Sequence, residues 1–405
     1  MLPGHYKGRD LTLTDMREFV GAVVAGKLTE RELKRIERVA CPGPGSCSMM
    51  ATANTMAATT EALGMSLTGC ATTHAVDPRK LFLAEESGRR VVELWKEKVK
   101  PSDIMTDEAF RNAITVDMAL GGSLNTCLHL PAIASELGIK IPLDLFDEIS
   151  RRTPHICPIK PAGQYTVKDL EEAGGMPAVM KELTPLLATE TLTVTGRTMG
   201  ENIREAKILR REIIRPLSEP VHKEGSVAVL RGSLAPGGAL VKRVAVKEEM
   251  LAHRGKAKVF NSMEDSVAAL IQGRIDRGDA IVIRYEGPKG GPGMREMHMV
   301  TSVLVGMGLD TTTALITDGR FSGSTRGPAI GYVSPEAAEG GPIAVIEDGD
   351  VVSYDISKRK LDIEIPDSEL KTRLSRWTPV AQERKGYLRR YARMVTSGDT
   401  GAILI

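Results

Sequence analysis

The chain has 405 residues, which is long enough for two or three domains and for a sizeable core that needs no disulfide or metal to fold. Its 42% apolar and 26% charged residues exclude a disordered chain, a coiled coil and a collagen-like fibre. The 54 basic and 52 acidic residues leave a net charge of +2, so we do not expect a dedicated nucleic-acid binder. No run of about 18 apolar residues occurs, and we therefore expect no membrane partner.

The chain begins with MLPGHYKGRD, which lacks the apolar core of an export signal. Five cysteines, an odd number, in a large chain without such a signal favour reduced thiols in a cytoplasm over a disulfide framework. A proline, a glycine and a basic loop directly ahead of a helix are also an unusual start for a domain. We expect this start to correspond to the interior of a longer protein.

The first 210 residues have the apolar spacing of helices and few strands. Apolar residues between Met16 and Val24 follow the spacing of one buried helix face. Thr29 and Glu32 form a capping box that starts a second helix, which ends near position 38. Further helices are predicted over residues 51–63, 78–98, 107–119, 130–137, 143–151 and 167–183.

From about residue 215 the chain changes to short segments rich in β-branched residues and bounded by Gly, Pro and Asp, as strands are. A helix over 262–272 interrupts these strands, and a helical tail begins at Asp367. The sequence therefore predicts two domains, 1–214 and 215–405, of which the second is β-rich and barrel-like. The predicted strands cover residues 226–232, 239–246, 280–287, 313–319, 343–356 and 360–365.

Twelve of the 40 glycines lie between positions 287 and 341, so we look for a ligand site there first. The loop EGPKGGPGMRE (286–296) follows a predicted strand, and successive backbone N–H groups in such a loop can form a nest for an anion such as a carboxylate. Glu296, just past the glycines, is a candidate metal ligand. The alternative is a rigid turn followed by a solvated glutamate.

The loop TDGRFSGSTRG (317–327) follows another predicted strand and places Ser322 and Ser324 between glycines, where their hydroxyls are exposed. A serine beside a Lewis-acidic metal can lose its proton and act as a base. The alternative is that both serines are ordinary turn residues.

The segment CPGPGSCSMMATANTM (41–56) carries Cys41 and Cys47 in a loop that opens a helix, where the helix N-terminus favours thiolates. Five residues separate the two cysteines, which is not the spacing of a zinc knuckle. Taken alone, the pair favours small buried thiols, and Cys70, Cys127 and Cys157 show no ligand spacing either.

The segment LGGSLNTCLHL (120–130) places Asn125 before an apolar helix. Asn125 can bind a ligand or cap the helix, and a cap is the favoured interpretation. His129 lies within the apolar helix, and we expect a core histidine there in preference to a metal ligand.

Together these segments resemble, in order, the motifs of the dihydroxy-acid dehydratase family, which includes phosphogluconate and sugar-acid dehydratases. The resemblance extends over the whole chain and includes GYVSPEAAEGGPIAVIEDGD and the tail RWTPVAQERKGYLRRYARMV. RYEGPKGGPGMREM and TDGRFSGSTRG are closer to the branched-chain dehydratases than to their sugar-acid relatives. The resemblance implies an α/β fold, in which the first part is the helix-rich remainder of an N-terminal α/β domain and the second is barrel-like.

The resemblance also implies a reaction and its cofactors. Family members remove water from 2,3-dihydroxy-3-methyl acids to form 2-keto acids in valine and isoleucine biosynthesis, using an iron–sulfur cluster (2Fe-2S here) and Mg²⁺. Cys47 matches a cluster ligand, Glu296 the magnesium ligand and Ser322 the serine that removes the proton, whereas Cys41 is not the ligand expected. A small dihydroxy-acid substrate, a homodimer and a cytoplasmic location follow from the same resemblance.

The chain departs from the family pattern at its start. Roughly 150 family residues, about one domain, precede the segment matched by MLPGHYKG, and they carry two further cluster cysteines and an Asp–Lys pair that have no counterpart here. A cluster takes three or four protein ligands, so Cys47 alone is insufficient. We therefore expect a dehydratase polypeptide without its N-terminal segment. The alternatives are a sugar-acid or phosphogluconate dehydratase, and an inactive fragment or complementing subunit.

Overall fold

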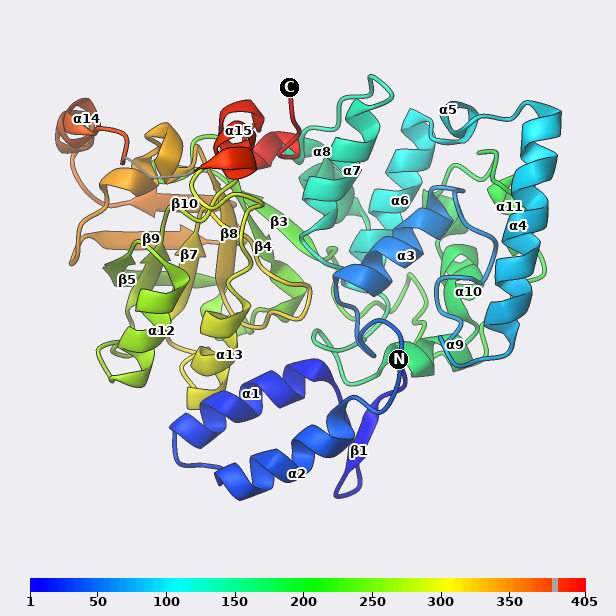
Figure 1. Cartoon of the computed structure of the whole chain (residues 1–405), viewed down its shortest axis with the longest axis horizontal. Helices are drawn as coiled ribbons and strands as arrows, with labels where there is room; N and C mark the ends of the chain where they lie inside the picture. The colour runs from blue at the N-terminus through cyan, green and yellow to red at the C-terminus, as the bar shows by residue number, and fades with distance from the viewer. Residues whose placement is uncertain (381–384) are drawn as a thin grey trace.

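The computed structural model describes residues 1–380 and 385–405 and has two parts, a helical body and a barrel (Figure 1). The fold class predicted from the sequence is confirmed, because helices fill the first part and an eight-stranded sheet fills the second. The helices of the first part are α1 (Leu13–Val24), α2 (Glu30–Ala40), α3 (Thr52–Ala62), α4 (Arg79–Glu97), α5 (Pro101–Ile104), α6 (Asp107–Leu120), α7 (Thr126–Ser135), α8 (Leu143–Arg152), α9 (Val167–Glu172), α10 (Gly175–Glu182) and α11 (Met199–Ile203).

Helix α6 is the centre of the helical body, and it packs against α3 and α8. Its first turn is capped by Thr106, whose side chain accepts a hydrogen bond from the Ala109 amide. The helix ends at Gly121, whose φ of 65° is the left-handed conformation that glycine adopts without strain. Most residues of α6 are buried, and its apolar side chains contribute to two buried clusters.

The N-terminal segment forms a hairpin, β1 (Gly4–Tyr6) and β2 (Arg9–Leu11), where the sequence predicted only a loop. After the hairpin, α1 packs against the barrel helix α13 (Figure 1). Gly21 and Gly306 meet at this crossing, since a Cβ on Gly21 would lie 2.8 Å from the Gly306 Cα. The predicted capping box is half formed: Thr29 accepts a hydrogen bond from the Glu32 amide, whereas the Glu32 carboxylate binds Lys7.

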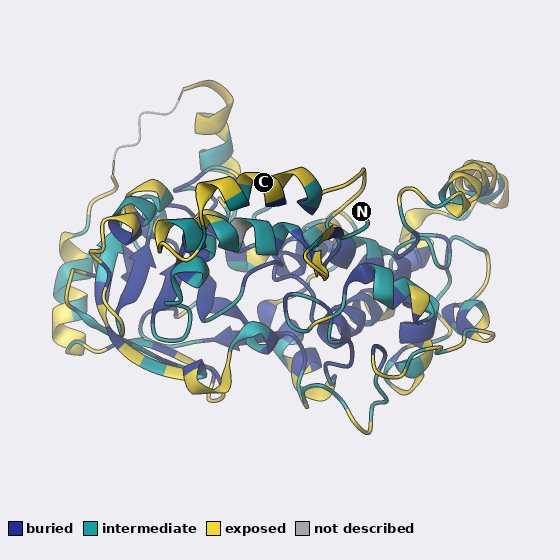
Figure 2. Ribbon diagram, turned by 90° about the horizontal axis from the view of Figure 1, so that it is seen from below, coloured by how far each residue is buried: buried dark blue, intermediate teal, exposed yellow. Residues whose placement is uncertain are grey.

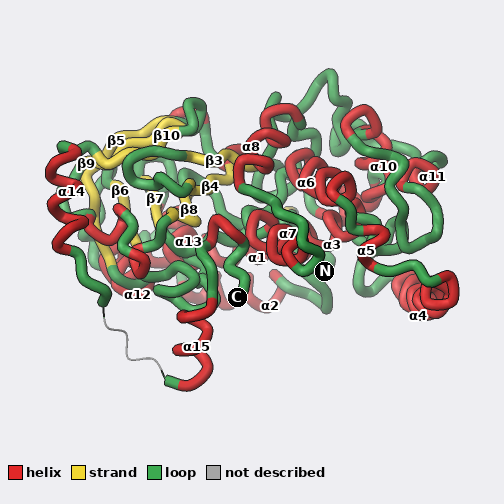
Figure 3. Tube along the Cα trace, turned by 90° about the horizontal axis from the view of Figure 1, so that it is seen from above, coloured by secondary structure: helices red, strands yellow, loops and turns green. Residues whose placement is uncertain are grey.

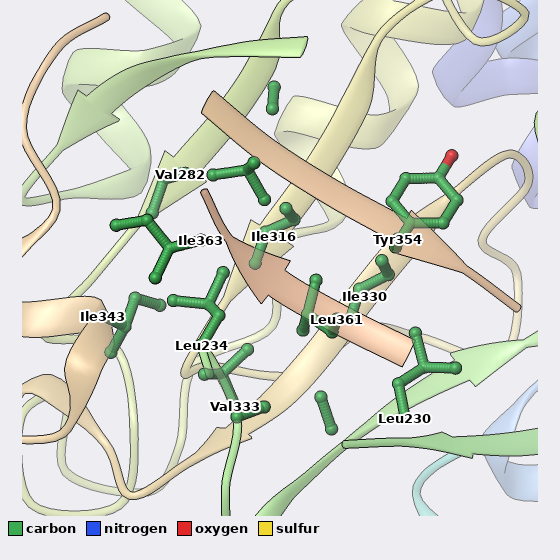
Figure 4. Close-up of a cluster of buried hydrophobic side chains, with 14 of the residues drawn as sticks. Leu230, Leu234, Val282, Ile316, Ile330, Val333, Ile343, Tyr354, Leu361 and Ile363 are labelled. Carbon is green, nitrogen blue, oxygen red and sulfur yellow. The ribbon is translucent and has the colours of Figure 1, made fainter. Parts of the chain in front are cut away.

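The barrel is a mixed sheet in the order β10-β9-β5-β6-β7-β8-β4-β3, with parallel pairing from β5 through β8. Its two edge strands meet at a backbone bridge between Arg231 and Lys360, which nearly closes the sheet. Alternate apolar side chains gather inside it, as Figure 4 shows for Val282, Ile316 and Leu361. Its strands are β3 (Val227–Leu230), β4 (Gly238–Lys242), β5 (Ala252–Phe260), β6 (Ala280–Ile283), β7 (Ala314–Thr317), β8 (Ala329–Ser334), β9 (Val351–Asp355) and β10 (Lys360–Ile363).

Helices α12 (Met263–Ile271) and α13 (His298–Met307) cover the outside of the barrel and bury a fourth apolar cluster. The tail forms α14 (Asp367–Arg376) and α15 (Gly386–Met394), as the sequence predicted, and positions 381–384 of the tail motif lie outside the described residues. Within residues 1–380 and 385–405, no helix has both the length and the apolar character that crossing a bilayer requires.

Several predicted elements differ from the structure. The helix predicted over 167–183 is two helices, because Gly174 and Gly175 both take positive φ values between them. The first part of the strand predicted over 343–356 is a 3-10 turn, Pro342–Val345, and only its second part is β9. Strands β5 and β8 and helix α13 were not predicted, since the apolar residues of their segments lack a clear period of two or of 3.6.

Candidate active site

Two of the three site residues expected from the sequence lie on neighbouring segments. Glu296 precedes α13 and forms a backbone bridge with Arg320, which follows β7. The Met297 amide donates to the Arg320 carbonyl at 2.8 Å. Ser322 is two residues beyond Arg320, so the glycine-rich loop and the serine loop run side by side at one end of the barrel.

The Glu296 carboxylate binds two donors from different parts of the chain. Its Oε1 accepts a hydrogen bond from the Asn125 amide at 2.8 Å and a weaker contact from the Arg320 guanidinium at 3.4 Å. The Glu296 side chain is 28% exposed, so it keeps contact with solvent. This carboxylate is therefore held in place and remains accessible to a ligand.

Asn125 is fully buried at the start of α7 and connects the helical body to the barrel. Besides Glu296, its amide nitrogen donates to the Thr52 hydroxyl at 2.8 Å, and its carbonyl accepts from the Tyr332 hydroxyl at 2.8 Å. The helix cap favoured from the sequence is wrong in this respect: Asn125 occupies the N-cap position, but its side chain makes no cap hydrogen bond. Its polar atoms instead orient Glu296.

Three non-glycine residues around this site have left-handed backbone conformations. Tyr285, Met294 and Tyr332 have φ values of 64°, 54° and 60°. Such conformations are costly for large side chains and persist where the surrounding structure imposes them, often at functional sites. Tyr332 lies in the middle of β8, and its hydroxyl reaches Asn125.

Ser322 is half-buried, and the Ser324 hydroxyl donates a hydrogen bond to its Oγ at 3.2 Å. The intervening Gly323 packs so closely on the helical body that a Cβ there would lie 2.9 Å from the Ala51 Cα and from the Ser123 Cβ. Glycine is required at this position because the two halves of the molecule meet at it.

Lys242, the last residue of β4, holds the serine loop. The lysine is buried, and its Nζ donates to the Gly323 carbonyl at 2.8 Å. Burial lowers the pKa of Lys242 to about 7, and Asp117 on α6 acts in the opposite direction. Burial also raises the pKa of Asp117 to about 7, although its Oδ2 accepts a hydrogen bond from Thr126 at 2.6 Å.

The anion nest predicted in the glycine-rich loop forms, but it is filled by the protein itself. The amides of Lys289 and Gly290 donate to the Glu336 carboxylate at 2.8 and 2.7 Å. Those of Tyr285 and Glu286 donate likewise to Asp318. These N–H groups shape the loop that presents Glu296 and are already engaged by internal carboxylates.

Cys47 lies in the loop before α3 and lines a cavity of about 380 Å³ together with Cys70, His74 and Lys80. The Asn54 amide nitrogen donates to the Cys47 carbonyl, which fixes the loop against α3. The Cys47 loop is connected to the glutamate through Thr52, which begins α3 five residues later and accepts a hydrogen bond from Asn125.

The described residues do not complete a metal or cluster site. Among them, no three His, Cys, Asp or Glu side chains are grouped so as to hold a metal ion. An iron–sulfur cluster takes three or four protein ligands, and the Glu296 oxygen that points to Asn125 is already hydrogen-bonded. Cys47 and Glu296 therefore supply single ligands at most.

His129 lies closer to the site than its sequence context suggested. It is half-buried on α7 and near enough to Arg320 and Glu296 for both charges to act on it. Burial lowers the pKa of His129, and Arg320 lowers it further. His129 is therefore only partly buried, and its charged neighbours Arg320 and Glu296 are residues of the candidate site.

Comparison with known proteins identifies the family. The sequence model described as the N-terminal part of dihydroxy-acid/6-phosphogluconate dehydratases matches residues 1–202, and the model of the C-terminal part matches residues 212–402. The chain belongs to the dihydroxy-acid/6-phosphogluconate dehydratase family. The two matches cover both the helical body and the barrel, and the domain limits 1–214 and 215–405 remain a prediction.

Curated relatives are similar over the whole chain. The dihydroxy-acid dehydratases of Methanothermobacter thermautotrophicus and Moorella thermoacetica are each 56% identical to it, and that of Methanosarcina barkeri is 51% identical. Each alignment covers 100% of this chain and 74% of the relative. The chain therefore spans about three quarters of the length of these relatives.

Three residues were not expected in these roles from the sequence: Asn125 as a partner of Glu296, and Tyr332 and Lys242. Arg320 was expected only as a charge near Ser322. Asn125, Arg320 and Tyr332 stand in motifs quoted above, so their positions carried a signal, whereas Lys242 lies in a predicted strand. Tyr332 and Lys242 look like ordinary strand residues. Only their contacts in the folded chain reveal their part in the site.

Proposed function

We propose that this chain is a dihydroxy-acid dehydratase polypeptide, a hydro-lyase that converts 2,3-dihydroxy-3-methyl carboxylic acids to 2-keto acids. The names of the similar proteins and the membership of the dehydratase family support this assignment. The structural observation that carries the proposal is the pairing of the Glu296 and Ser322 segments at the end of the barrel.

The reaction removes a proton from C2 and a hydroxyl group from C3, and the resulting enol becomes the 2-keto acid. We assign Ser322 as the acceptor of the C2 proton, because the Ser324 hydroxyl donates to its oxygen and favours the deprotonated form. Arg320 supplies the positive charge of this cluster, next to which a carboxylate substrate is favoured. Asn125 keeps Glu296 oriented toward the same space.

The finer parts of the proposal concern cofactors and setting. They are a 2Fe-2S cluster with Cys47 as one ligand, Mg²⁺ with Glu296 as one ligand, a role in valine and isoleucine biosynthesis, a homodimer and a cytoplasmic location. When bound, the cluster and the magnesium ion supply the Lewis acidity that makes hydroxide a better leaving group. Their remaining ligands have to come from groups outside the described residues.

The test is turnover of 2,3-dihydroxy-3-methylbutanoate, followed as 2-keto acid, after anaerobic incubation of the purified chain with iron, sulfide and Mg²⁺. We expect Ser322→Ala to reduce turnover by about 10²-fold or more. Ser87→Ala, which changes an exposed serine on α4, is the matched control and should keep full activity. Faster turnover of gluconate-type acids would replace the proposed substrate with a sugar acid.

A second candidate is an inactive or complementing subunit, favoured by the incomplete ligand set among the described residues. It predicts that the purified chain binds little iron and stays colourless after the same incubation. A brown protein with visible absorbance, which Cys47→Ser abolishes, would exclude this candidate and support the first.

A further inference from the structure

Lys242 is a buried lysine at the junction of the two halves of the molecule. Its strand, β4, is buried along its whole length, and Lys242 itself is 2% exposed. Strand β4 lies on the side of the barrel next to the helical body (Figures 1 and 3), and the barrel strands are mostly buried in Figure 2. Lysine is almost never fully buried without a specific partner, so the contact of this side chain shows what it does.

The partner of Lys242 is the β-turn that carries the candidate serine. The turn runs from Ser322 to Thr325 and is closed by the Thr325 amide, which donates to the Ser322 carbonyl at 3.1 Å. Its central residues are Gly323 and Ser324. The Lys242 Nζ donates to the Gly323 carbonyl at 2.8 Å. This carbonyl belongs to the central peptide unit of the turn, whose orientation distinguishes the common turn types.

The other side of the same peptide unit faces the serine oxygen. The carbonyl and the N–H of a trans peptide point in opposite directions. Lys242 binds the Gly323 carbonyl, and the Ser324 N–H is directed at the Ser322 Oγ at 3.5 Å. The Ser324 hydroxyl donates to the same oxygen at 3.2 Å. Both donor distances are long, and such contacts shorten when the acceptor becomes negatively charged.

The turn alone gives this peptide unit little restraint, because its first central residue is glycine. Glycine leaves the bonds that flank the peptide free to rotate. A stiffer residue is excluded at position 323, since a Cβ there would lie 2.9 Å from the Ala51 Cα. A rotation that turned the Ser324 N–H away from Ser322 would also turn the Gly323 carbonyl away from Lys242. The lysine contact therefore supplies the restraint that the glycine lacks.

Lys242 is itself held in place by the barrel. Its backbone pairs with Val227 of β3. Three residues after Lys242, the Ala245 carbonyl accepts a hydrogen bond from the Gly327 amide at 3.0 Å, just beyond the turn. The end of β4 and the serine loop thus run side by side, and the lysine reaches the turn from a fixed strand.

The charge of Lys242 acts on the same peptide unit. A positive charge at the oxygen end of a peptide polarises it and strengthens the N–H at the other end as a donor. Burial lowers the pKa of Lys242 to about 7, whereas the attraction of Asp117 on α6 favours the ammonium form. The neighbouring His155 carries no charge at neutral pH, because burial lowers its pKa to about 3. Both forms of the lysine side chain retain N–H donors, so the contact with the turn persists across its pKa.

We infer that Lys242 is a positioning residue for Ser322: it holds the central peptide of the turn so that both donors of Ser324 point at the Ser322 Oγ. The inference rests on the proposed function, in which this oxygen accepts the C2 proton. Without the lysine, Ser322 keeps its place in the chain, but its negatively charged form loses a fixed donor and a polarising charge. The deprotonated serine is then harder to form.

The test is the pKa of a thiol placed at the serine position by Ser322→Cys, because a thiol reports the donors and charges around it. The rate of its alkylation by iodoacetamide is measured against pH, and mass spectrometry of the labelled peptide separates it from the five native cysteines. We expect Lys242→Met in the Ser322→Cys background to raise the apparent thiol pKa by about one unit. The measurement needs neither cofactor nor turnover, so it stands apart from the proposed dehydratase activity.

Lys160→Met is the matched control. The Lys160 ammonium also donates to a backbone carbonyl, that of Asp10 at 3.2 Å, and its loss should leave the thiol pKa unchanged. Circular dichroism compares the folding of the two lysine variants. If Lys242→Met does not fold, Lys242→Met/Asp117→Asn, which also removes the buried carboxyl that acts on the lysine, gives the same measurement with the same expected rise.

Turnover separates the inference from the proposed function. In the active enzyme, Lys242→Met should lower kcat by about tenfold or more with little change in KM, and Lys160→Met should change neither. A thiol pKa that Lys242→Met leaves unchanged would overturn the inference, whatever the activity. A raised thiol pKa in a chain whose Ser322→Ala variant keeps full turnover would instead reject Ser322 as the base, and the effect of the lysine on the turn would stand.

Discussion

Helices α4 and α6 belong to the same half of the molecule and have opposite environments. In α6, 11 of 14 residues are buried, whereas in α4 only one of 19 is. Both carry apolar residues at helical spacing. The difference teaches that an apolar pattern specifies a helix and a face, while the position of the helix in the fold decides whether that face joins the core or remains on the surface.

The largest expected difference is in stability after truncation of a phenylalanine. Phe110→Ala on α6 removes a side chain that is 1% exposed, and we expect it to lower the free energy of unfolding by about 3–5 kcal/mol. Phe82→Ala on α4 removes one that is 72% exposed, and the change should stay within about 0.5 kcal/mol. Denaturant unfolding measures both, and similar losses would show that α4 is packed in solution.

Glycines near the two helices should respond differently to an added methyl group. A Cβ on Gly122, just after α6, would lie 1.8 Å from the Asp117 Oδ1. We expect Gly122→Ala to cost about 1–3 kcal/mol of unfolding free energy through overpacking. Thermal unfolding of this variant beside Gly88→Ala on α4 gives the control, because Gly88 has open space around it and, like Gly122, no positive φ.

The buried carboxylate of α6 should make stability depend on pH. Burial raises the pKa of Asp117 from 3.8 to about 7, so between these values the folded chain binds more protons than the unfolded chain. Its contribution to stability is therefore present below pH 4 and is lost as the pH rises toward 7, with a slope of at most about 1.4 kcal/mol per pH unit. Asp117→Asn should flatten this fall in urea titrations from pH 4 to 7.

Glu97 of α4 provides the contrast for that experiment. A hydrogen bond from Arg90 lowers the pKa of this exposed carboxylate. Glu97→Gln should therefore leave the fall between pH 4 and 7 in place. An unchanged pH profile in Asp117→Asn would show that the aspartate is not the group responsible.

The smallest expected effect is a gain in unfolding free energy. Gly88→Ala on α4 places a methyl group in open space and improves helix propensity, so the chain should gain about 0.5–1 kcal/mol in unfolding free energy. Denaturant unfolding measures this gain. A lower unfolding free energy in the variant would show that the Gly88 position is packed in solution.

Local signals predicted many of the elements well. Thr29, expected from the sequence as the cap of α2, accepts a hydrogen bond from the Glu32 amide three positions later. Such signals are readable because the contacting groups are neighbours in the chain. Strand β8 was not predicted, since its residues are buried on both sides and pair with β4, about 90 positions earlier.

The candidate site likewise contains residues that the sequence indicates and residues that only long-range contacts bring to it. Glu296 and Ser322 stand in glycine-rich loops that the sequence marks as ligand loops, and their roles remain predictions. Asn125 reaches Glu296 across 171 positions and Tyr332 across 207, and no sequence spacing encodes such contacts. The prediction of an anion nest was also incomplete, because the carboxylate that occupies the nest belongs to Glu336, which lies in a distant turn.

The sequence by itself determined the helical first part, the barrel-like second part, the dehydratase motifs and the two loops that carry Glu296 and Ser322, because capping, periodicity and turn chemistry act between neighbours. The contacts of the folded chain, in contrast, make Asn125 orient Glu296 and Lys242 hold the serine loop, and they leave the apolar residues Leu81 and Trp95 of α4 exposed. These outcomes depend on which surfaces meet, and that is settled by packing over the whole chain.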